Sequence, residues 1–169
     1  MAGGPGLDSR ICLFRYEARA AQAVQRLKYE RATCLASELS RLLFEFVDAQ
    51  GLLVCDLIVP VPIHWSRLAH RGFNQSELLC ESMPKDKTRT DALKRIRATP
   101  PQARLSHDER FKNLKDAFRA SKFVEGKSVL LVDDVLTSGQ TFAECANALK
   151  QAGATKVDAV ALCGSDKSM

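Results

Sequence analysis

Apolar residues recur along the chain in two patterns that alternate. Three short, nearly continuous apolar runs are typical of central parallel strands covered on both faces, and they lie at 52–61, 129–132 and 157–163. Three other segments carry apolar residues at helical spacing and predict amphipathic helices at 19–29, 33–50 and 142–152. Because strand and helix alternate, the pattern predicts an α/β fold with a mainly parallel sheet flanked by helices.

The pattern between these elements is less regular. Residues 62–73 predict a loop, and a capping-box pattern predicts a helix over 74–83. Residues 85–97 carry six Lys or Arg against two Asp, with a short strand predicted inside this basic stretch. The proline-containing residues 98–105 predict a mobile loop, and a second capping-box pattern predicts a short helix over 106–114.

The length of 169 residues fits one domain with a sizeable core. The chain begins with a glycine-rich segment, and we expect residues 1–15 to be disordered and residues 16–169 to form the domain. No stretch looks like a secretory signal, and the longest apolar run is too short to span a bilayer, so a cytoplasmic protein without a membrane segment is expected.

Composition adds little that is specific. Hydrophobic residues make up 46% and charged residues 27%, as in ordinary soluble globular proteins. The formal net charge of +5 suits an anionic ligand but does not by itself imply nucleic acid. The six cysteines contain no C-x-x-C pair, which argues against a zinc knuckle, and several lie in apolar runs where cysteine is usually a small core residue.

The segment after the apolar run 129–132 carries the most informative chemistry. Asp133 and Asp134 can accept hydrogen bonds from vicinal hydroxyls. The following loop, 137–141, offers hydroxyls and backbone N–H groups to a phosphate at a helix N-terminus. A sugar diol beside a phosphate is a ribose 5-phosphate, so the segment indicates a phosphoribosyl ligand.

Other interpretations of this segment are weaker. A receiver domain also has an acidic pair after a strand, but only 35 residues follow Asp134, too few for the rest of that fold. Neither the G-x-G-x-x-G pattern of dinucleotide sites nor the P-loop pattern is present. If the acidic pair stood alone, we would interpret it as a solvated turn, with Thr141-x-x-Glu144 as an ordinary helix cap. The whole sequence of strand, acidic pair, hydroxyl-rich loop and helix start favours a phosphoribosyl ligand instead.

At these residues the chain resembles the type I phosphoribosyltransferases, and more narrowly the ComF family. The closer resemblance rests on the segments 27–29, 59–62, 71–75 (Arg-Gly-Phe-Asn-Gln) and 102–118, and it extends from about Tyr16 to Cys163. The resemblance implies a type I phosphoribosyltransferase fold, with a helical hood at 16–50 and a flexible lid loop. The chain lacks the four-cysteine zinc ribbon with which many ComF-like proteins begin, and it has Ser138 and Gln140 where a second Thr and a small residue are commoner.

The resemblance also implies a donor and a reaction. The donor would be phosphoribosyl pyrophosphate (PRPP), whose ribose is transferred to a nucleophilic acceptor with release of pyrophosphate. Asp133 and Asp134 would bind the ribose hydroxyls as the catalytic pair. The 5-phosphate would be bound by Thr137, Ser138, Gly139, Gln140 and Thr141. Mg²⁺ would be held mainly through PRPP, and no protein ligand to the metal is named.

Other parts of the site are expected from the same resemblance. The pyrophosphate would be bound by Pro62, Ile63, His64 and Arg71, with His64 a local hydrogen-bonding residue rather than a general acid. The lid would span 98–106, bringing Arg104 or Arg110 to the pyrophosphate when it closes. Lys28 would be a hood residue, although a solvated helix lysine explains it almost as well.

Two kinds of function remain open. The chain could be a phosphoribosyltransferase with an unidentified acceptor. Alternatively, it could be a non-catalytic PRPP sensor, or a module of the competence machinery that binds partner proteins or single-stranded DNA through the basic stretch 85–97. A charge run is usually a solvated face, and no aromatic residues are interleaved with this one. Amidotransferase chemistry is not expected of this chain alone, because a glutaminase needs its own domain and nucleophile.

Overall fold

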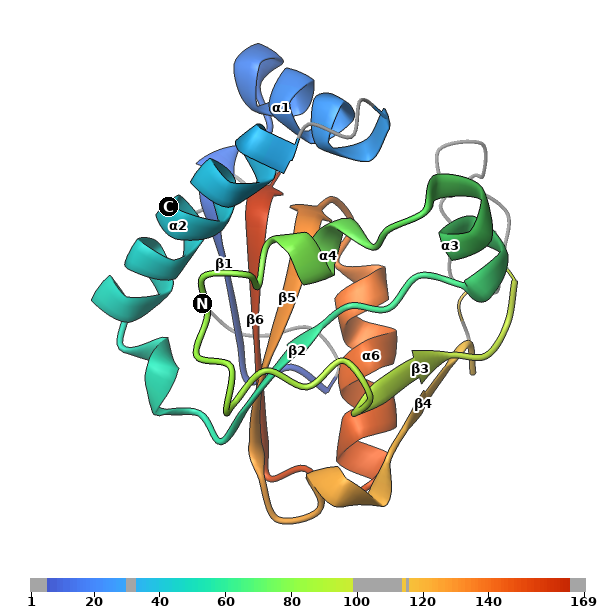
Figure 1. Ribbon diagram of the computed structural model, residues 1–169. Helices are drawn as coiled ribbons and strands as arrows, with labels where there is room; N and C mark the ends of the chain where they lie inside the picture. Colours follow the sequence, from blue (N-terminus) through green and yellow to red (C-terminus); the bar gives the residue numbers. More distant parts are fainter. Residues whose placement is uncertain (1–5, 30–32, 99–113, 115, 165–169) are drawn as a thin grey trace.

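A four-stranded parallel sheet forms the centre of the molecule (Figure 1). This computed structural model describes residues 6–29, 33–98, 114 and 116–164. The strand order is β1-β6-β5-β2, and all three neighbouring pairs are parallel. The strands are β1 (Ser9–Arg15), β2 (Leu57–Pro60), β5 (Ser128–Leu136) and β6 (Lys156–Gly164).

Each face of the sheet is covered by a separate apolar layer. Alternate strand residues point to opposite faces, so Leu131 belongs to one layer and its neighbour Leu130 to the other. Leu131 shares its layer with helix α6 (Gln140–Gln151). The layer of Leu130 includes residues of α1 (Ala18–Tyr29) and α2 (Thr33–Ala49), and Leu79 at the end of α4 (Gln75–Leu78). The mainly parallel sheet flanked by helices, predicted from the sequence, is confirmed.

A two-stranded antiparallel hairpin extends the α6 side of the molecule. It consists of β3 (Leu93–Arg95) and β4 (Phe118–Ala120), and Leu93 and Phe118 pack into the same apolar layer as α6. The short helices are α3 (Trp65–Arg71) and the 3₁₀ turns η1 (Leu52–Val54) and η3 (Lys122–Val124).

The N-terminal segment differs from the expectation of disorder over residues 1–15, because residues 9–15 form the edge strand β1. Hydrogen bonds anchor its start: Asp8 N donates to Val157 O at 2.9 Å, and Val157 N donates back to Asp8 Oδ2 at 2.7 Å. Ser9 Oγ also donates to Asp158 Oδ1 at 2.6 Å. These partners lie almost 150 residues away, so no local pattern could reveal them.

Several element boundaries also differ from the sequence prediction. The run 52–61 is not one strand: η1 precedes β2, and Val54 is 86% exposed. The predicted loop 62–73 contains α3, which has no buried residue and therefore no apolar period to detect. The helix predicted over 74–83 is only α4 followed by turns. The mobile loop and short helix expected at 98–114 lie almost entirely outside the described residues.

The described cysteines are buried in the core, as their apolar neighbours in the sequence predicted. The five cysteines whose side chains the structure describes, Cys12, Cys55, Cys80, Cys145 and Cys163, are all buried thiols. Burial raises the pKa of the Cys80 thiol to about 12, so it stays protonated near neutral pH. Among the described helices, none combines the length and apolar character needed to cross a membrane.

Candidate functional site

The two acids lie at the carboxyl end of β5, where the sheet opens. Strand β2 pairs with β5 only as far as Pro60 opposite Val132, whereas β6 continues to pair with β5 up to Leu136. The chain after β2 leads to α4 on one face of the sheet, and the chain after β5 leads to α6 on the other face. This divergence is a topological switch point, the usual ligand site of a parallel α/β sheet.

Asp133 and Asp134 project to opposite faces of β5, because side chains alternate along a strand. Asp134 is 5% exposed, and Asp133 is partly exposed. The Asp133 Oδ1 atom accepts hydrogen bonds from the Asp134 backbone N–H at 2.9 Å and from Ser76 Oγ at 2.7 Å. Two donors therefore hold Asp133 at the end of β5, beside the crevice that is expected at the switch point of such a sheet.

The loop after the acids has the geometry of an anion site. Thr137 and Ser138 are exposed, and Gly139 is the N-cap residue of α6 with a φ of 74°. This left-handed conformation is readily adopted by glycine, and it turns the chain from the loop directly into the first turn of α6, whose backbone N–H groups point toward the helix start. The loop and the helix end together offer backbone donors and a favourable dipole to an anion.

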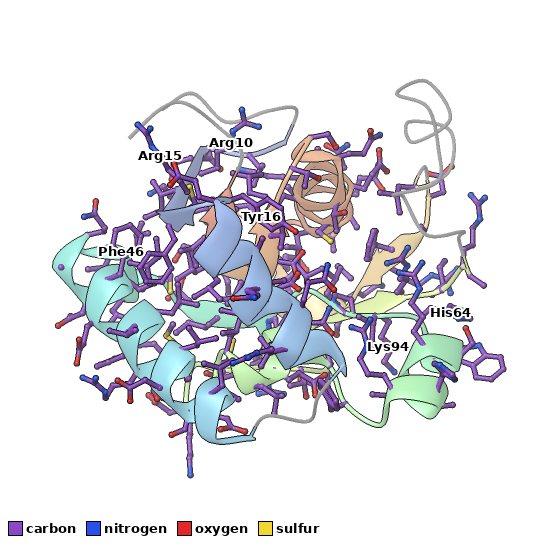
Figure 2. The ribbon with its side chains drawn as sticks, turned by 90° about the horizontal axis from the view of Figure 1, so that it is seen from above. Arg10, Arg15, Tyr16, Phe46, His64 and Lys94 are labelled. Carbon is purple, nitrogen blue, oxygen red and sulfur yellow. The ribbon has the colours of Figure 1, made fainter. Side chains whose placement is uncertain are left out.

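Arg10 on β1 reaches the same loop from the sheet edge. A Cβ atom on Gly139 would lie 2.7 Å from Arg10 Nη1, so the guanidinium packs directly against this glycine. Figure 2 shows Arg10 on β1 near the end of α6, on the opposite side of the view from His64. Arg10 was not among the residues predicted from the sequence, because it lies in the segment expected to be disordered.

The predicted pyrophosphate loop, residues 61–64, leaves the sheet between β2 and α3. His64 Nδ1 accepts from the backbone N–H of Ser66 at 3.3 Å and lies 2.8 Å from Ser66 Oγ, so His64 caps α3. His64 is 6% exposed, and its side chain has the local hydrogen-bonding role that the sequence favoured over that of a general acid.

Arg71 and the residues after it form a hydrogen-bonded bridge across the crevice. Arg71 Nη1 donates to Gln75 Oε1 at 2.5 Å. Asn74 Nδ2 donates to Val61 O at 3.1 Å, and Asn74 Oδ1 accepts from Ser76 N at 3.1 Å, which caps α4. Ser76 in turn reaches Asp133. The segment 71–76 therefore joins the loop after β2 to the acid pair, a role that its sequence did not reveal.

Arg95 is a second residue that lies near the site in the structure although the sequence did not assign it there. The sequence placed it in a basic stretch with a possible role in DNA binding, but it is partly buried on β3, with its guanidinium 5.4 Å from the Phe118 ring centroid. Burial lowers the pKa of Arg95 and the positive charge of Arg67 lowers it further, while Asp133 acts in the opposite direction. Arg95 thus lies within electrostatic reach of Arg67 and of Asp133.

The remaining predicted site residues receive no structural test. Arg104 and Arg110 lie outside the described residues, and the side chain of Lys28, near the end of α1, is also not described. Within the described part of the chain, no group of three or more His, Cys, Asp or Glu could hold a metal ion.

Comparison with known families gives the class of protein that this fold and site define. The sequence matches the family described as "Phosphoribosyl transferase domain" over residues 78–168, a range that contains β5, the loop after it and α6. The chain is thus a phosphoribosyltransferase domain with the α/β architecture of the type I fold, as the resemblance implied.

Relatives over most of the chain make the assignment narrower. The "DNA utilization protein YhgH" of Escherichia coli K12 is 42% identical over 147 residues, which are 83% of this chain and 65% of the relative. The protein of the same name from Salmonella typhi is 36% identical over 181 residues, 96% of this chain and 80% of the relative. "Competence protein F" of Haemophilus influenzae is 30% identical over 163 residues, 90% of this chain and 71% of the relative. The chain belongs to the ComF family.

Proposed function

We propose that this chain binds PRPP and transfers its 5-phosphoribosyl group to a nucleophilic acceptor, releasing pyrophosphate. One observation carries the proposal: the acid pair at the end of β5 is followed at once by the Gly139-capped start of α6, at the switch point of a parallel sheet. Two carboxylates suited to a ribose diol and a helix start suited to its 5-phosphate therefore follow one another within a single loop, and this supports the proposal.

The side chains have distinct parts in the proposed reaction. The acceptor forms a bond to C1 of the ribose as the bond from C1 to pyrophosphate breaks. The electron pair of the broken bond leaves with pyrophosphate, and the acceptor loses a proton. Asp133 and Asp134 fix the ribose through its hydroxyls, and their negative charge favours a ribose ring that becomes cationic in the transition state. Residues 137–141 hold the 5-phosphate, which orients the sugar.

Pyrophosphate is assigned to the opposite side of the crevice. The backbone of residues 61–64 faces it in the proposal, and Arg67, Arg71 and Arg95 supply positive charge for the negative charge that develops as it leaves. Mg²⁺ enters on PRPP, held by substrate oxygens, and neutralises part of the same charge. Residues 98–106 are the proposed lid, which would exclude water from the reactive sugar.

The test measures binding and turnover separately. Isothermal titration of the chain with PRPP and Mg²⁺ should give saturable binding, and a pyrophosphate-release assay over a panel of nitrogen nucleophiles should identify the acceptor class. Wild-type protein that binds no PRPP would overturn the proposal. PRPP binding without turnover on any acceptor would leave the sensor function in place of the transferase.

A second candidate function, contact with single-stranded DNA, is favoured by the names of the relatives, which refer to DNA utilization and competence. The basic stretch 85–97 gives it limited support, because its cations do not act together. Lys87 Nζ donates to Leu53 O at 2.7 Å, Arg89 pairs with Asp91 at 3.0 Å, and Arg95 is partly buried against the Phe118 ring.

Two exposed lysines of this stretch, Lys85 and Lys94, provide a clean test of DNA contact. Charge reversal at both positions should weaken salt-dependent binding to single-stranded DNA if the stretch is a DNA site. Unchanged DNA binding in the Lys85→Glu, Lys94→Glu variant would exclude the stretch 85–97 as a DNA site. Arg95 is left intact in this variant, so that the PRPP site is not altered at the same time.

A further inference from the structure

Ser76 contacts Asp133 although 57 residues separate them in the chain. Its Oγ donates a hydrogen bond of 2.7 Å to Asp133 Oδ1. Ser76 is 1% exposed, so water competes little for this hydroxyl. A hydrogen bond to an ionised carboxylate is roughly twice as strong as one between neutral groups, and burial strengthens it further. The contact is therefore strong enough to influence how the carboxylate is oriented.

Two donors converge on the same carboxylate oxygen. The Asp134 backbone N–H also donates to Asp133 Oδ1, at 2.9 Å. The terminal torsion of an aspartate side chain is broad, so the backbone of β5 alone does not set the plane of the carboxylate. Two donors from different directions do set it, and neither of these two bonds uses Oδ2. The direction in which Asp133 presents its second oxygen thus depends on Ser76.

The position of Ser76 is itself fixed from the far side of the crevice. Its backbone N–H donates to Asn74 Oδ1 at 3.1 Å, and Asn74 Nδ2 donates to Val61 O at 3.1 Å. Val61 begins the loop assigned to pyrophosphate. Asn74 is 3% exposed, so this connection is buried along with Ser76.

We propose that Ser76 is a positioning residue for the ribose half of the site, holding Asp133 in the orientation that accepts a hydrogen bond from the ribose diol. The inference rests on the proposed function and adds a residue to it. Ser76 acts through Asp133 and not on phosphate groups. Removal of the Ser76 hydroxyl therefore lowers the affinity for ligands that carry the ribose diol, and it leaves the affinity for ligands that consist of phosphate alone unchanged.

The test titrates Ser76→Ala with three probes in the presence of Mg²⁺: ribose 5-phosphate, PRPP and inorganic pyrophosphate. The affinity for ribose 5-phosphate and for PRPP should fall about tenfold, the loss expected for one hydrogen bond to a charged group. The affinity for pyrophosphate should change less than about twofold, because pyrophosphate has no diol. Equal loss for all three probes, or no loss for ribose 5-phosphate, overturns the inference.

Ser40→Ala is a matched control. Ser40 is fully buried, and its hydroxyl donates to Leu79 O at 3.1 Å and accepts from Ser82 N at 2.8 Å, both backbone groups next to α4. The control removes a buried serine hydroxyl near the same helix without touching an acid. It should change the affinity for none of the three probes.

A double-mutant cycle with Asp133→Asn separates positioning from general damage. If Ser76 acts through Asp133, adding Ser76→Ala to Asp133→Asn should weaken ribose 5-phosphate binding by less than about threefold further. A full tenfold further loss overturns the inference. If Ser76→Ala does not fold, Ser76→Cys keeps the side-chain size with a weaker donor and should give the same ligand pattern. The wild-type PRPP titration decides the proposed function, and the variants decide the role of Ser76.

Discussion

The two sides of the crevice are built in different ways. The acid pair and the loop 137–141 form one continuous segment, in which a strand end, a turn and a helix start fix the geometry locally. The opposite side is assembled from residues 61–64, 71–76 and Arg95, which are joined by hydrogen bonds and charges between separate elements. A continuous segment keeps its shape through its own backbone, whereas an assembled side depends on each contact. Substitutions on the first side should therefore affect ligand binding far more than stability, and those on the second should affect both.

The largest effect is expected from Gly139→Ala. The new Cβ would meet Arg10 Nη1 at 2.7 Å, so this side chain must move away from the loop, and alanine strains a backbone with φ of 74°. Loss of the neighbouring cation, together with an anion cradle misplaced by about 1 Å, can cost about a hundredfold, and we expect this loss in ribose 5-phosphate affinity by calorimetry. Gly126→Ala is the matched control: its φ is 73°, but nothing lies within 4 Å of the new Cβ. It should lose only ~1 kcal/mol of stability and keep its affinity. Equal affinity in both variants contradicts the assignment of the loop.

Asp134→Asn should have the next largest effect. The substitution keeps the size of a buried side chain and removes the charge that the ribose hydroxyls are proposed to meet. PRPP affinity should fall about thirtyfold, as for the loss of a strong hydrogen bond to a charged acceptor. Asp48→Asn removes an exposed carboxylate at the end of α2 and should leave PRPP binding unchanged. Wild-type PRPP affinity in Asp134→Asn would exclude the acid pair from the site.

Arg95→Gln tests whether Arg95, which only the tertiary structure brings near Asp133, contributes to pyrophosphate binding on the assembled side. Removing its charge should weaken pyrophosphate binding about tenfold, because one charge-assisted contact is lost. Arg89→Gln is the control, since Arg89 lies in the same stretch but pairs with Asp91 at the surface. If the two variants bind pyrophosphate equally well, Arg95 has no special place in the site.

Asn74→Ala should change stability and binding together. It removes the cap of α4 and the bond to Val61 O, so the free energy of unfolding should fall by ~1 kcal/mol in urea denaturation. Pyrophosphate affinity should fall about threefold as the loop loses its support. Ser121→Ala removes a comparable cap, the bond from Phe123 N at 3.3 Å, far from the acids. A binding loss in Ser121→Ala equal to that in Asn74→Ala would mean that the effect is not local to the bridge.

The smallest effect concerns the anchor of β1, which carries Arg10 to the loop. The hydrogen bond from Lys150, at 2.8 Å, and the bond from Val157 N lower the pKa of Asp8 below 3.8. Since the folded protein binds this proton less readily than the unfolded chain, the stabilisation is present above pH 3.8 and is lost as the pH falls through the native pKa. Asp8→Asn should lower the free energy of unfolding at pH 7 by less than ~1 kcal/mol, because the pair is partly exposed. The difference from wild type should close in acid, and a difference that is constant with pH would contradict this account.

Much of the fold was predictable, because the strongest signals were local. The runs at 129–132 and 157–163 correspond to buried parts of β5 and β6, and the periodic segments correspond to α1, α2 and α6. The elements that were missed lack such a signal. Helix α3 buries no residue, and β1 is an edge strand held by partners almost 150 residues away.

The sequence by itself was enough to predict the proposed ligand side of the site, because one continuous segment contains both carboxylates and the loop that is proposed to bind phosphate. Only the tertiary structure decided the rest. It brought Arg10 against Gly139, Arg95 toward Asp133, and Ser76 into hydrogen-bond contact with Asp133. The physical reason is distance along the chain: backbone geometry fixes neighbours within a few residues, but contacts between residues far apart in the chain, such as Ser76 and Asp133 at a separation of 57 positions, exist only once the helices have packed on the sheet.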